Sequence, residues 1–411
     1  FCLSMYQKNK IELLAPAGNR EKLKFAFLYG ADAVYIGFKD LSLRSYAEKF
    51  SISDIKKSVD EANKSEKKIY IALNAYVEEN SFKKAERAID KINEIKPHAV
   101  IVSDPGIINL VLKRLDKRIS IHLSTQANTL NSEAVSFWKK QGIKRIILGR
   151  ELSLSEIKKI YSKVRDIEFE IFCHGAMCVS YSGRCLLSSF MTGRKANKGK
   201  CAHPCRWKYR LIEEERPREH FAVDETDEGT FIFNSKDLCM VDYVKKIRLA
   251  GISAIKVEGR MKSLYYIACV TRAYRKAIDN CYGKENFPFR KIREELEKVS
   301  HRKYTTGFYI NGKNDYDMQE YSSSAYHRKY DFLGIVIKVK KDCAVVNVRN
   351  KIRKNEKIEI IGPDMKKDRV TRVGEMRDEK GVDICDANPG TNICVKFPVN
   401  IFLGDIIRKE L

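Results

Sequence analysis

The chain has 411 residues, of which 44% are hydrophobic, so its composition excludes a disordered protein and leaves room for two domains. Its 78 basic and 54 acidic residues give a formal net charge of +24, which attracts polyanions such as RNA or DNA. No apolar run is long enough to span a bilayer and the first residues lack a signal-peptide core, so we expect a cytoplasmic protein without a membrane partner.

Short apolar runs alternate with amphipathic stretches through most of the chain. Runs typical of buried strands occupy residues 11–15, 33–37, 68–73, 99–103, 119–122, 145–148, 167–172 and 254–257. Helical periodicity covers residues 20–29, 52–65, 82–95, 132–141 and 155–164. About eight strand–helix repeats predict a parallel α/β barrel of the TIM type. An open doubly wound sheet is the alternative, because the pattern does not show closure.

A long segment interrupts this alternation between the seventh and eighth expected strands. We expect the seventh strand to end at Phe172 and residues 173–239 to form an insertion rich in glycine, serine, lysine and arginine. Long loops inside compact domains usually carry function, and active sites of barrels lie at the carboxyl ends of the strands. The insertion is therefore expected to cover the mouth of the barrel.

Five cysteines in this insertion carry the most specific chemistry of the sequence: Cys178, Cys185, Cys201, Cys205 and Cys239. Thiolates among glycines and basic residues suit an iron–sulfur cluster. Zinc is the alternative, although the spacing of the first pair departs from that of zinc fingers. Because the cysteines are concentrated in one stretch of a large chain, disulfides are not expected. The others are predicted to be core or surface thiols: Cys2, Cys173, Cys269, Cys281, Cys343, Cys385 and Cys394.

Basic and aromatic residues surround these cysteines. Cations position phosphates and aromatic faces stack an unpaired base, so the segment is a candidate RNA-binding surface. A basic loop that only shields the thiolates, or a genome-wide bias toward lysine, is the alternative. The candidates are Arg184, Arg194, Lys195, Lys198, Lys200, Arg206, Trp207, Lys208 and Tyr209.

The pattern changes toward the end of the chain. Residues 262–280 and 289–300 have helical periodicity, and residues 307–329 have the polar composition of a linker. From residue 330 short runs alternate at period two, which predicts a small β-barrel over residues 330–411. We therefore expect a catalytic barrel domain over residues 1–306, with the linker and the second domain after it. The second domain either contacts RNA or supports the first one structurally.

Several motifs together resemble one known family. The segment Gly175-Ala-Met-Cys178 followed by Gly183-x-Cys185 resembles the signature of the collagenase-like peptidase family U32. The opening Glu12-Leu-Leu-Ala-Pro16 and the segment Lys256-Val-Glu258-Gly-Arg260 are similar to that family as well. The similarity extends over nearly the whole chain, and the cysteine signature is highly specific.

The resemblance implies an activity that the family name does not. Its better understood members are oxygen-independent hydroxylases with a 4Fe–4S cluster. One branch hydroxylates the wobble uridine of tRNA to 5-hydroxyuridine with prephenate as hydroxyl donor, another modifies a cytidine of ribosomal RNA, and a third hydroxylates quinone precursors. Some members work with a paralogous protein partner. This chain looks most like the tRNA branch. The alternatives are a hydroxylase of ribosomal RNA or of a quinone precursor, and a peptidase, although His-Glu-x-x-His and Gly-x-Ser-x-Gly do not occur.

By this resemblance Cys178, Cys185 and Cys201 are cluster ligands. The fourth ligand is Cys239 in one branch and Cys205 in another. We favour Cys239, because it follows an apolar run and would approach the site from a firm scaffold. Cys205 would then lie beside the cluster or serve as an exchangeable ligand.

A dianionic donor such as prephenate requires cations at the site. Arg150 and Arg260 follow expected strands and are candidate clamps, because arginine binds carboxylates bidentately. Lys256 and Glu258 lie at the same strand end, and an arginine–glutamate pair that closes the barrel rim is the alternative. His122 is a candidate acid–base group or a buried, hydrogen-bonded histidine. Further candidates are Glu12, Asn74 and Gln126.

Overall fold

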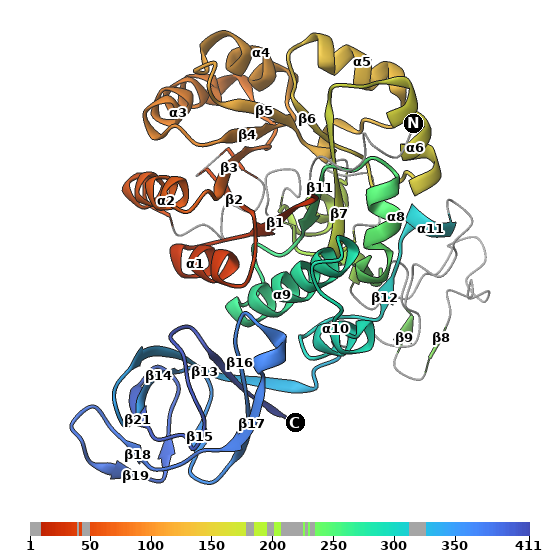
Figure 1. The fold of residues 1–411 in the computed structure, drawn as a ribbon. Helices are drawn as coiled ribbons and strands as arrows, with labels where there is room; N and C mark the ends of the chain where they lie inside the picture. Colours follow the sequence, from red (N-terminus) through yellow and green to blue (C-terminus); the bar gives the residue numbers. More distant parts are fainter. Residues whose placement is uncertain are drawn as a thin grey trace, which may run out of the picture.

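The fold is that of a computed structural model, which Figure 1 draws as a ribbon. A barrel of strands and helices contains most of the chain, and a smaller domain of strands follows it (Figure 1). The structure describes residues 10–38, 41–42, 50–177, 185–194, 201–206, 225–226, 229–230, 235–311 and 326–411.

Eight parallel strands form the barrel. Each pairs with the next, and the last strand, β11, pairs with both β1 and β7, which closes the ring. Closure confirms the expected TIM-like barrel and excludes an open doubly wound sheet, which would leave two unpaired edges. The strands are β1 (Glu12–Pro16), β2 (Ala33–Gly37), β3 (Lys68–Leu73), β4 (Ala99–Val102), β5 (Ser120–Leu123), β6 (Arg145–Ile147), β7 (Glu168–Ala176) and β11 (Ala254–Val257).

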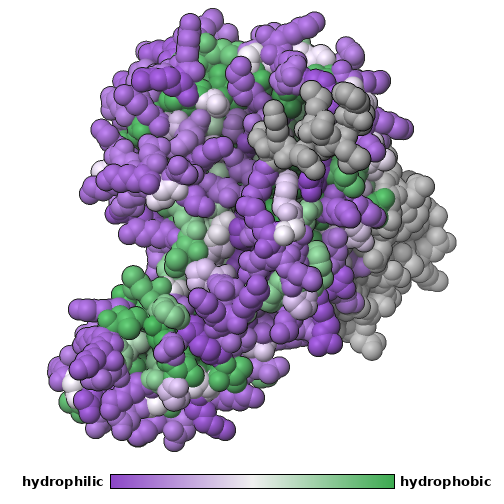
Figure 2. Space-filling model, in the orientation of Figure 1, coloured by the Kyte–Doolittle hydropathy of each residue, from purple (hydrophilic) through white to green (hydrophobic). Residues whose placement is uncertain are grey.

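Helices follow the strands and cover the outside of the barrel (Figure 1). Ser51 and Ser153 begin two of them with capping boxes, and Asp104 caps a helix whose first residue is Pro105. Hydrophilic residues dominate the visible barrel surface in Figure 2. No described helix is long and apolar enough to cross a membrane. The helices are α1 (Arg20–Leu28), α2 (Ile52–Lys64), α3 (Phe82–Ile95), α4 (Pro105–Arg114), α5 (Ser132–Lys140), α6 (Leu154–Lys163), α8 (Val244–Leu249), α9 (Leu264–Cys281) and α10 (Phe289–Glu297).

Strand β7 ends later than expected, because it continues past Phe172 to Ala176. Its last residues pair in the antiparallel direction with β10 (Asp237–Cys239), and β12 (Tyr304–Thr305) pairs with β10. Both ends of the cysteine-rich segment are therefore attached to the barrel sheet. Cys173 is buried on β7, as expected for a core thiol. Between β7 and β10 the described elements are α7 (Leu187–Thr192), the 3-10 helix Pro204–Arg206, β8 (Glu225–Thr226) and β9 (Gly229–Thr230).

A cluster of charges fills the amino-terminal end of the barrel. The guanidinium of Arg145 lies 2.6 Å from Glu12, 3.2 Å from Glu170 and 2.6 Å from Glu168. Lys68 Nζ lies 2.9 Å from the second oxygen of Glu12. Burial alone would raise the pKa of Glu12, but the charge and hydrogen bond of Arg145 outweigh it and lower this pKa to about 2. This cluster forms the floor of the barrel, at the amino-terminal ends of the strands. A ligand site is therefore expected at the opposite, carboxyl end.

The second domain is a curled antiparallel sheet, as the period-two pattern predicts. Its strand order is β17-β16-β22-β13-β14-β21-β18-β19, with a small β15–β20 pair. Alternate residues of β14 are buried in a core separate from that of the barrel. The strands are β13 (Tyr330–Val339), β14 (Ala344–Val348), β15 (Ile352–Arg353), β16 (Lys357–Ile361), β17 (Arg369–Arg372), β18 (Met376–Arg377), β19 (Asp383–Ile384), β20 (Asp386–Ala387), β21 (Asn392–Val395) and β22 (Ile406–Glu410).

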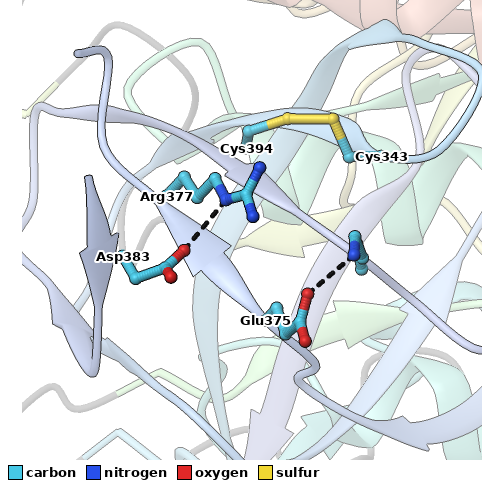
Figure 3. The surroundings of a disulfide bond; sticks show 6 residues. Cys343, Glu375, Arg377, Asp383 and Cys394 are labelled. Carbon is cyan, nitrogen blue, oxygen red and sulfur yellow. Dashed lines mark hydrogen bonds and ion pairs between the residues drawn. A yellow bond between two sulfur atoms is a disulfide. The ribbon is translucent and has the colours of Figure 1, made fainter. Parts of the chain in front are cut away.

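A disulfide joins Cys343 to Cys394 in this domain, with the Cα atoms 6.0 Å apart (Figure 3). The prediction that these cysteines are unpaired thiols was therefore wrong. The cause is strand register: β14 pairs with β21 so that Val345 lies opposite Cys394, and Cys343 is two residues away at the start of the same strand pair. Linear spacing in the sequence carries no information about this pairing.

Buried ion pairs join the two domains. Glu295 on α10 lies 2.7 Å from Arg272 on α9 and 2.7 Å from Arg408 on β22. Neither arginine side chain is exposed. The remaining donors of the two arginines reach Asp368 at 2.8 Å and Glu359 at 2.9 Å, both in the second domain. Burial opposes the charge of Glu295, but the two arginines lower its pKa to about 2.

Candidate active site at the carboxyl end of the barrel

Polar side chains from three consecutive strands meet at the carboxyl end of the barrel. Asn74 Nδ2, after β3, donates to Gln126 Oε1 at 3.0 Å, and Ser124 Oγ, after β5, donates to the same oxygen. Ser103 Oγ, after β4, donates to the carbonyl of Asn74 at 3.2 Å. The short 3-10 helix Thr125–Ala127 orients Gln126. The structure thus brings together the two amides that the sequence offered as candidates.

Three cations gather around two aromatic rings at this end. The guanidinium of Arg150 lies 4.1 Å from the centre of the Phe172 ring, and Lys256 Nζ lies 5.5 Å from it. Lys256 Nζ also lies 4.2 Å from the Tyr35 ring, and Arg260 lies 5.8 Å from the same ring. The expected clamps Arg150 and Arg260 therefore lie on one wall of the barrel mouth, with Lys256 between them.

Two buried polar atoms on this wall lack partners among the described residues. They are Nε of Arg150 and the hydroxyl of Tyr309. Tyr309 lies on the short helix α11 (Phe308–Asn311), it is 1% exposed, and burial raises the pKa of its hydroxyl. Buried polar groups in folded proteins are normally hydrogen-bonded. These atoms therefore fit a polar ligand in the barrel mouth.

Side chains of β2, of the loop after it and of α9 hold Glu258 and Arg260 in place. The hydroxyl of Tyr35 lies 3.0 Å from the carbonyl of Val257 and 3.4 Å from a carboxylate oxygen of Glu258. Tyr266 donates to the carbonyl of Glu258 at 3.0 Å. Arg260 Nη1 lies 3.4 Å from Ser42 Oγ. This loop therefore presents a carboxylate and a guanidinium at fixed positions on the rim.

The structure places His122 inside the barrel, close to the charged floor. Its ring makes an edge-on contact with Tyr70 at 4.8 Å, and the Tyr70 hydroxyl donates to Glu12. Burial, assisted by the charge of Arg145, holds the pKa of His122 well below its ordinary value, so the ring is neutral. Its Nδ1 has no partner in the described part of the chain. The acid–base role of His122 stays a prediction.

Cys239 is attached to the barrel wall through β10. Its backbone pairs with His174 on β7, and the Tyr274 hydroxyl lies 4.0 Å from its sulfur. Tyr274 also donates to the carbonyl of Cys173 and accepts from the amide of Met240, which fixes the ring. Burial raises the pKa of the Cys239 thiol to about 12, so without a nearby cation it is protonated.

The other described cysteines lie around α7. Ser188 on this helix donates to the carbonyl of Arg194 and accepts from the amide of Ala202, which ties the helix to the segment of Cys201. Cys205 follows on the 3-10 helix Pro204–Arg206, which packs against α7. Cys178 lies outside the described residues. Among those described, no three metal-binding side chains lie close enough to hold one ion.

The donor chemistry of the segment fits a cluster even so. Cys185, Cys201 and Cys239 are free thiols, and soft sulfur donors select iron–sulfur clusters or zinc. A bound cation would also reverse the effect of burial on the Cys239 pKa, because a coordinated thiol loses its proton. The choice between Cys205 and Cys239 as fourth ligand stays a prediction.

Most of the predicted RNA-binding residues lie outside the described part of the chain. These are Arg184, Lys195, Lys198, Lys200, Trp207, Lys208 and Tyr209. Arg194 is described, and its side chain is exposed after the end of α7. Arg206 is the last residue of the 3-10 helix that carries Cys205. The RNA-binding role of these residues stays a prediction.

Sequence reasoning missed the aromatic part of the site. Phe172 and Tyr35 looked like ordinary strand residues, because apolar alternation does not distinguish a core ring from one that faces a cation. Tyr309 was assigned to a linker, far along the chain from β7. The apolar neighbours Phe308 and Ile310 were the available signal, and they do not identify the barrel as the partner of Tyr309.

The fold and the site together describe one class of protein: a closed (β/α) barrel with cations at its mouth, followed by an antiparallel second domain. The model of Peptidase family U32 matches residues 18–319, and the model of the U32 C-terminal domain matches residues 328–408. The chain belongs to peptidase family U32, as the cysteine signature indicated.

Relatives in this family carry names that refer to RNA. "tRNA hydroxylation protein P1" of Bacillus subtilis is 39% identical over 97% of this chain and 95% of its own. "tRNA hydroxylation protein P" of Escherichia coli is 38% identical over 86% of each chain. "23S rRNA 5-hydroxycytidine C2501 synthase" of Escherichia coli is 34% identical over 66% of this chain and 40% of its own.

Proposed function

We propose that this protein is an iron–sulfur enzyme that hydroxylates the wobble uridine of tRNA to 5-hydroxyuridine without oxygen, with prephenate as hydroxyl donor. The observation that carries the proposal is the similarity, over nearly the whole length of both chains, to a protein named for tRNA hydroxylation. The name of the ribosomal RNA relative supports the same type of product, a pyrimidine hydroxylated at position 5. The net charge of +24 supports a polyanionic substrate.

The barrel mouth supports an anionic donor. Arg150 and Arg260 offer bidentate hydrogen bonds to carboxylates. Lys256 lies between them, but its Nζ pairs with the buried Glu170 at 3.4 Å, so the two arginines carry the charge for the donor. The ring faces of Phe172 and Tyr35 lie beside these cations and offer apolar contact to a carbocycle. Such a wall would bind and orient a dianionic cyclic donor.

Cys178, Cys185, Cys201 and Cys239 would hold the cluster, which when bound supplies one-electron transfer. Hydroxylation at carbon 5 replaces a C–H bond by a C–O bond, and this is a two-electron oxidation of the base. The donor balances it, because its C–OH bond breaks and a C–H bond replaces it, so that the donor is reduced by two electrons. Glu258 at the rim is the candidate to accept the proton, because its carboxylate is held beside the Tyr35 hydroxyl. A wobble base is unpaired, so it can reach the mouth without opening a helix.

Nucleoside analysis tests the proposal. The protein is purified anaerobically, reconstituted, and incubated with unmodified tRNA with and without prephenate, and digested nucleosides are examined by mass spectrometry. We expect 5-hydroxyuridine only with prephenate, and none with Cys178→Ser. Iron and sulfide analysis of Cys205→Ser and Cys239→Ser then identifies the fourth ligand. Absence of the modified nucleoside from a fully loaded protein would overturn the proposal.

The family name supplies a second candidate, a peptidase. The sequence has neither the His-Glu-x-x-His nor the Gly-x-Ser-x-Gly arrangement of well-known proteases. Gelatin hydrolysis by the same preparation tests this alternative, and activity that survives Cys178→Ser would favour it.

A further inference from the structure

A pocket of about 430 Å³ lies between the two domains, outside the barrel mouth. Its walls come from the start of α9, from the segment after residue 325 and from the first residues of β13. Its volume lies within the range typical of small-molecule sites, roughly 300–1,000 Å³. It is therefore large enough for a nucleotide.

Aromatic rings form much of this pocket. Tyr265 of α9 and Phe332 of β13 stack with centroids 5.6 Å apart and planes 9° apart, which joins the two domains behind the pocket. Tyr266, Tyr326 and Tyr330 add further rings, and Tyr326 is 42% exposed. Exposed aromatic rings in a concave site are the usual platform for an unpaired base.

The charge of the pocket is positive. Lys262 Nζ lies 4.7 Å from the Tyr326 ring and 5.2 Å from the Tyr266 ring. Arg328 also lines the pocket, but its charge is paired with Asp331, so Lys262 carries the positive charge of the site. Among the described residues that line the pocket none is acidic. The pocket therefore combines base-stacking surfaces with a cation available for a phosphate.

The pocket adjoins the candidate active site along the chain. The rim residues Glu258 and Arg260 are followed directly by Met261 and Lys262, which line the pocket. Tyr266 connects the two sites, because its ring lines the pocket while its hydroxyl donates to the carbonyl of Glu258 at 3.0 Å. A strand of RNA with one base in the barrel mouth would thus have a neighbouring nucleotide near the pocket.

We propose that this pocket binds an unpaired RNA nucleotide that flanks the modified base, with the base stacked on Tyr326 and the phosphate near Lys262. The inference rests on the proposed function as an RNA-modifying enzyme, and adds a recognition site for the substrate. It assigns a role in specificity to the junction of the domains, since neither domain forms the pocket alone.

Binding measurements with matched variants test this site. Affinity for fluorescein-labelled unmodified tRNA is measured by anisotropy over a range of salt for the full chain. We expect Tyr326→Ala to weaken binding roughly five- to 100-fold, and Tyr326→Phe to bind like wild type, because stacking needs the ring and not the hydroxyl. Lys262→Ala should reduce the slope of log affinity against log salt by about 0.7, with Lys56→Ala, on the exposed face of α2, as control. Thermal melting checks that each variant is folded.

The outcomes separate this inference from the proposed function. If wild type binds tRNA and the Tyr326→Ala and Lys262→Ala variants bind equally well, the pocket is not an RNA site, whereas the proposed function stands. If wild type does not bind tRNA at all, both fail. Binding of UMP that Tyr326→Ala abolishes, while the affinity for tRNA stays unchanged in that variant, would assign the pocket to a free nucleotide and overturn the RNA site.

Discussion

At the scale of single residues, Arg150 is the most informative side chain of the barrel mouth. Its guanidinium rests on the Phe172 ring, and its Nε is buried without a partner among the described residues. A charged donor in this state gains a hydrogen bond when an anionic ligand arrives, and such bonds contribute about 1.5–3 kcal/mol. Arg150 is therefore suited to ligand binding more than to stability.

Replacement of this residue should affect the donor specifically. We expect Arg150→Gln to raise the KM or Kd for prephenate roughly 10- to 100-fold, because a charged hydrogen bond is lost. The matched control is Arg165→Gln, since Arg165 lies 4.3 Å from the Tyr161 ring on the exposed side of the barrel. Calorimetric titration with prephenate provides the measurement, and equal affinities in both variants would contradict the role.

His174 gives a prediction for pH dependence. Burial lowers its pKa to about 3 from an ordinary value of 6.5. Below about pH 6.5 the imidazole of His174 binds a proton in the unfolded chain but stays neutral in the folded protein. The contribution of this residue to the free energy of unfolding is therefore complete above pH 6.5 and declines toward pH 3. Between pH 7.5 and pH 5 the loss is about 2 kcal/mol. Urea unfolding of His174→Asn should show a pH difference smaller by this amount, and an unchanged difference would refute it.

The site could be predicted from sequence only in part, and the limit is physical. Arg150 and Arg260 follow apolar runs, so the rule that barrel sites lie after strands locates them. Tyr309 and Tyr326 cannot be located in this way, because each reaches its site through tertiary contacts made far along the chain. Lys256 could be predicted in part. The sequence shows a positive charge within an apolar strand, but it does not show which aromatic rings lie beside that charge.

At the scale of elements, the eight barrel strands and most helices could be predicted from periodicity, because burial on both faces makes each strand a continuous apolar run. Strand β10 could not, since three residues are too few to carry a periodic signal and only pairing with β7 makes them a strand. The disulfide was missed for the same reason, because it depends on the register of β14 against β21.

The disulfide predicts a difference between oxidised and reduced protein. Reduction should lower the stability of the second domain by about 2–4 kcal/mol, because the unfolded chain is no longer constrained by the cross-link. Thermal melting with and without reductant measures this. Cys343→Ser should remove the difference, while Cys385→Ser, at an exposed free thiol of the same domain, should retain it. Mass spectrometry of alkylated, unreduced protein must also find the peptides of Cys343 and Cys394 linked.

At the scale of the whole molecule, the buried cluster around Glu295 decides how firmly the domains are joined. Removal of one partner from a buried ion pair typically costs 3–5 kcal/mol, because the remaining charges stay buried. We expect Glu295→Gln to lower the free energy of unfolding by roughly this amount. The control is Glu294→Gln on the same helix, since Glu294 is 52% exposed and pairs with Arg290, and should cost less than about 1 kcal/mol.

Denaturant unfolding followed by fluorescence distinguishes these variants. If the cluster couples the domains, wild type should unfold in one transition, and Glu295→Gln should separate the transitions of the barrel and the second domain. A destabilisation shared equally by Glu294→Gln would show that the effect belongs to α10 and not to the junction.

The same cluster has a consequence for recombination between relatives. A crossover in the segment between the domains would inherit Arg272 and Glu295 from one parent and Arg408, Asp368 and Glu359 from the other. A chimera whose parents differ at any of these positions would contain a buried charge without its counterpart. The second domain can therefore be exchanged without loss of stability only between relatives that share all five of these charged residues.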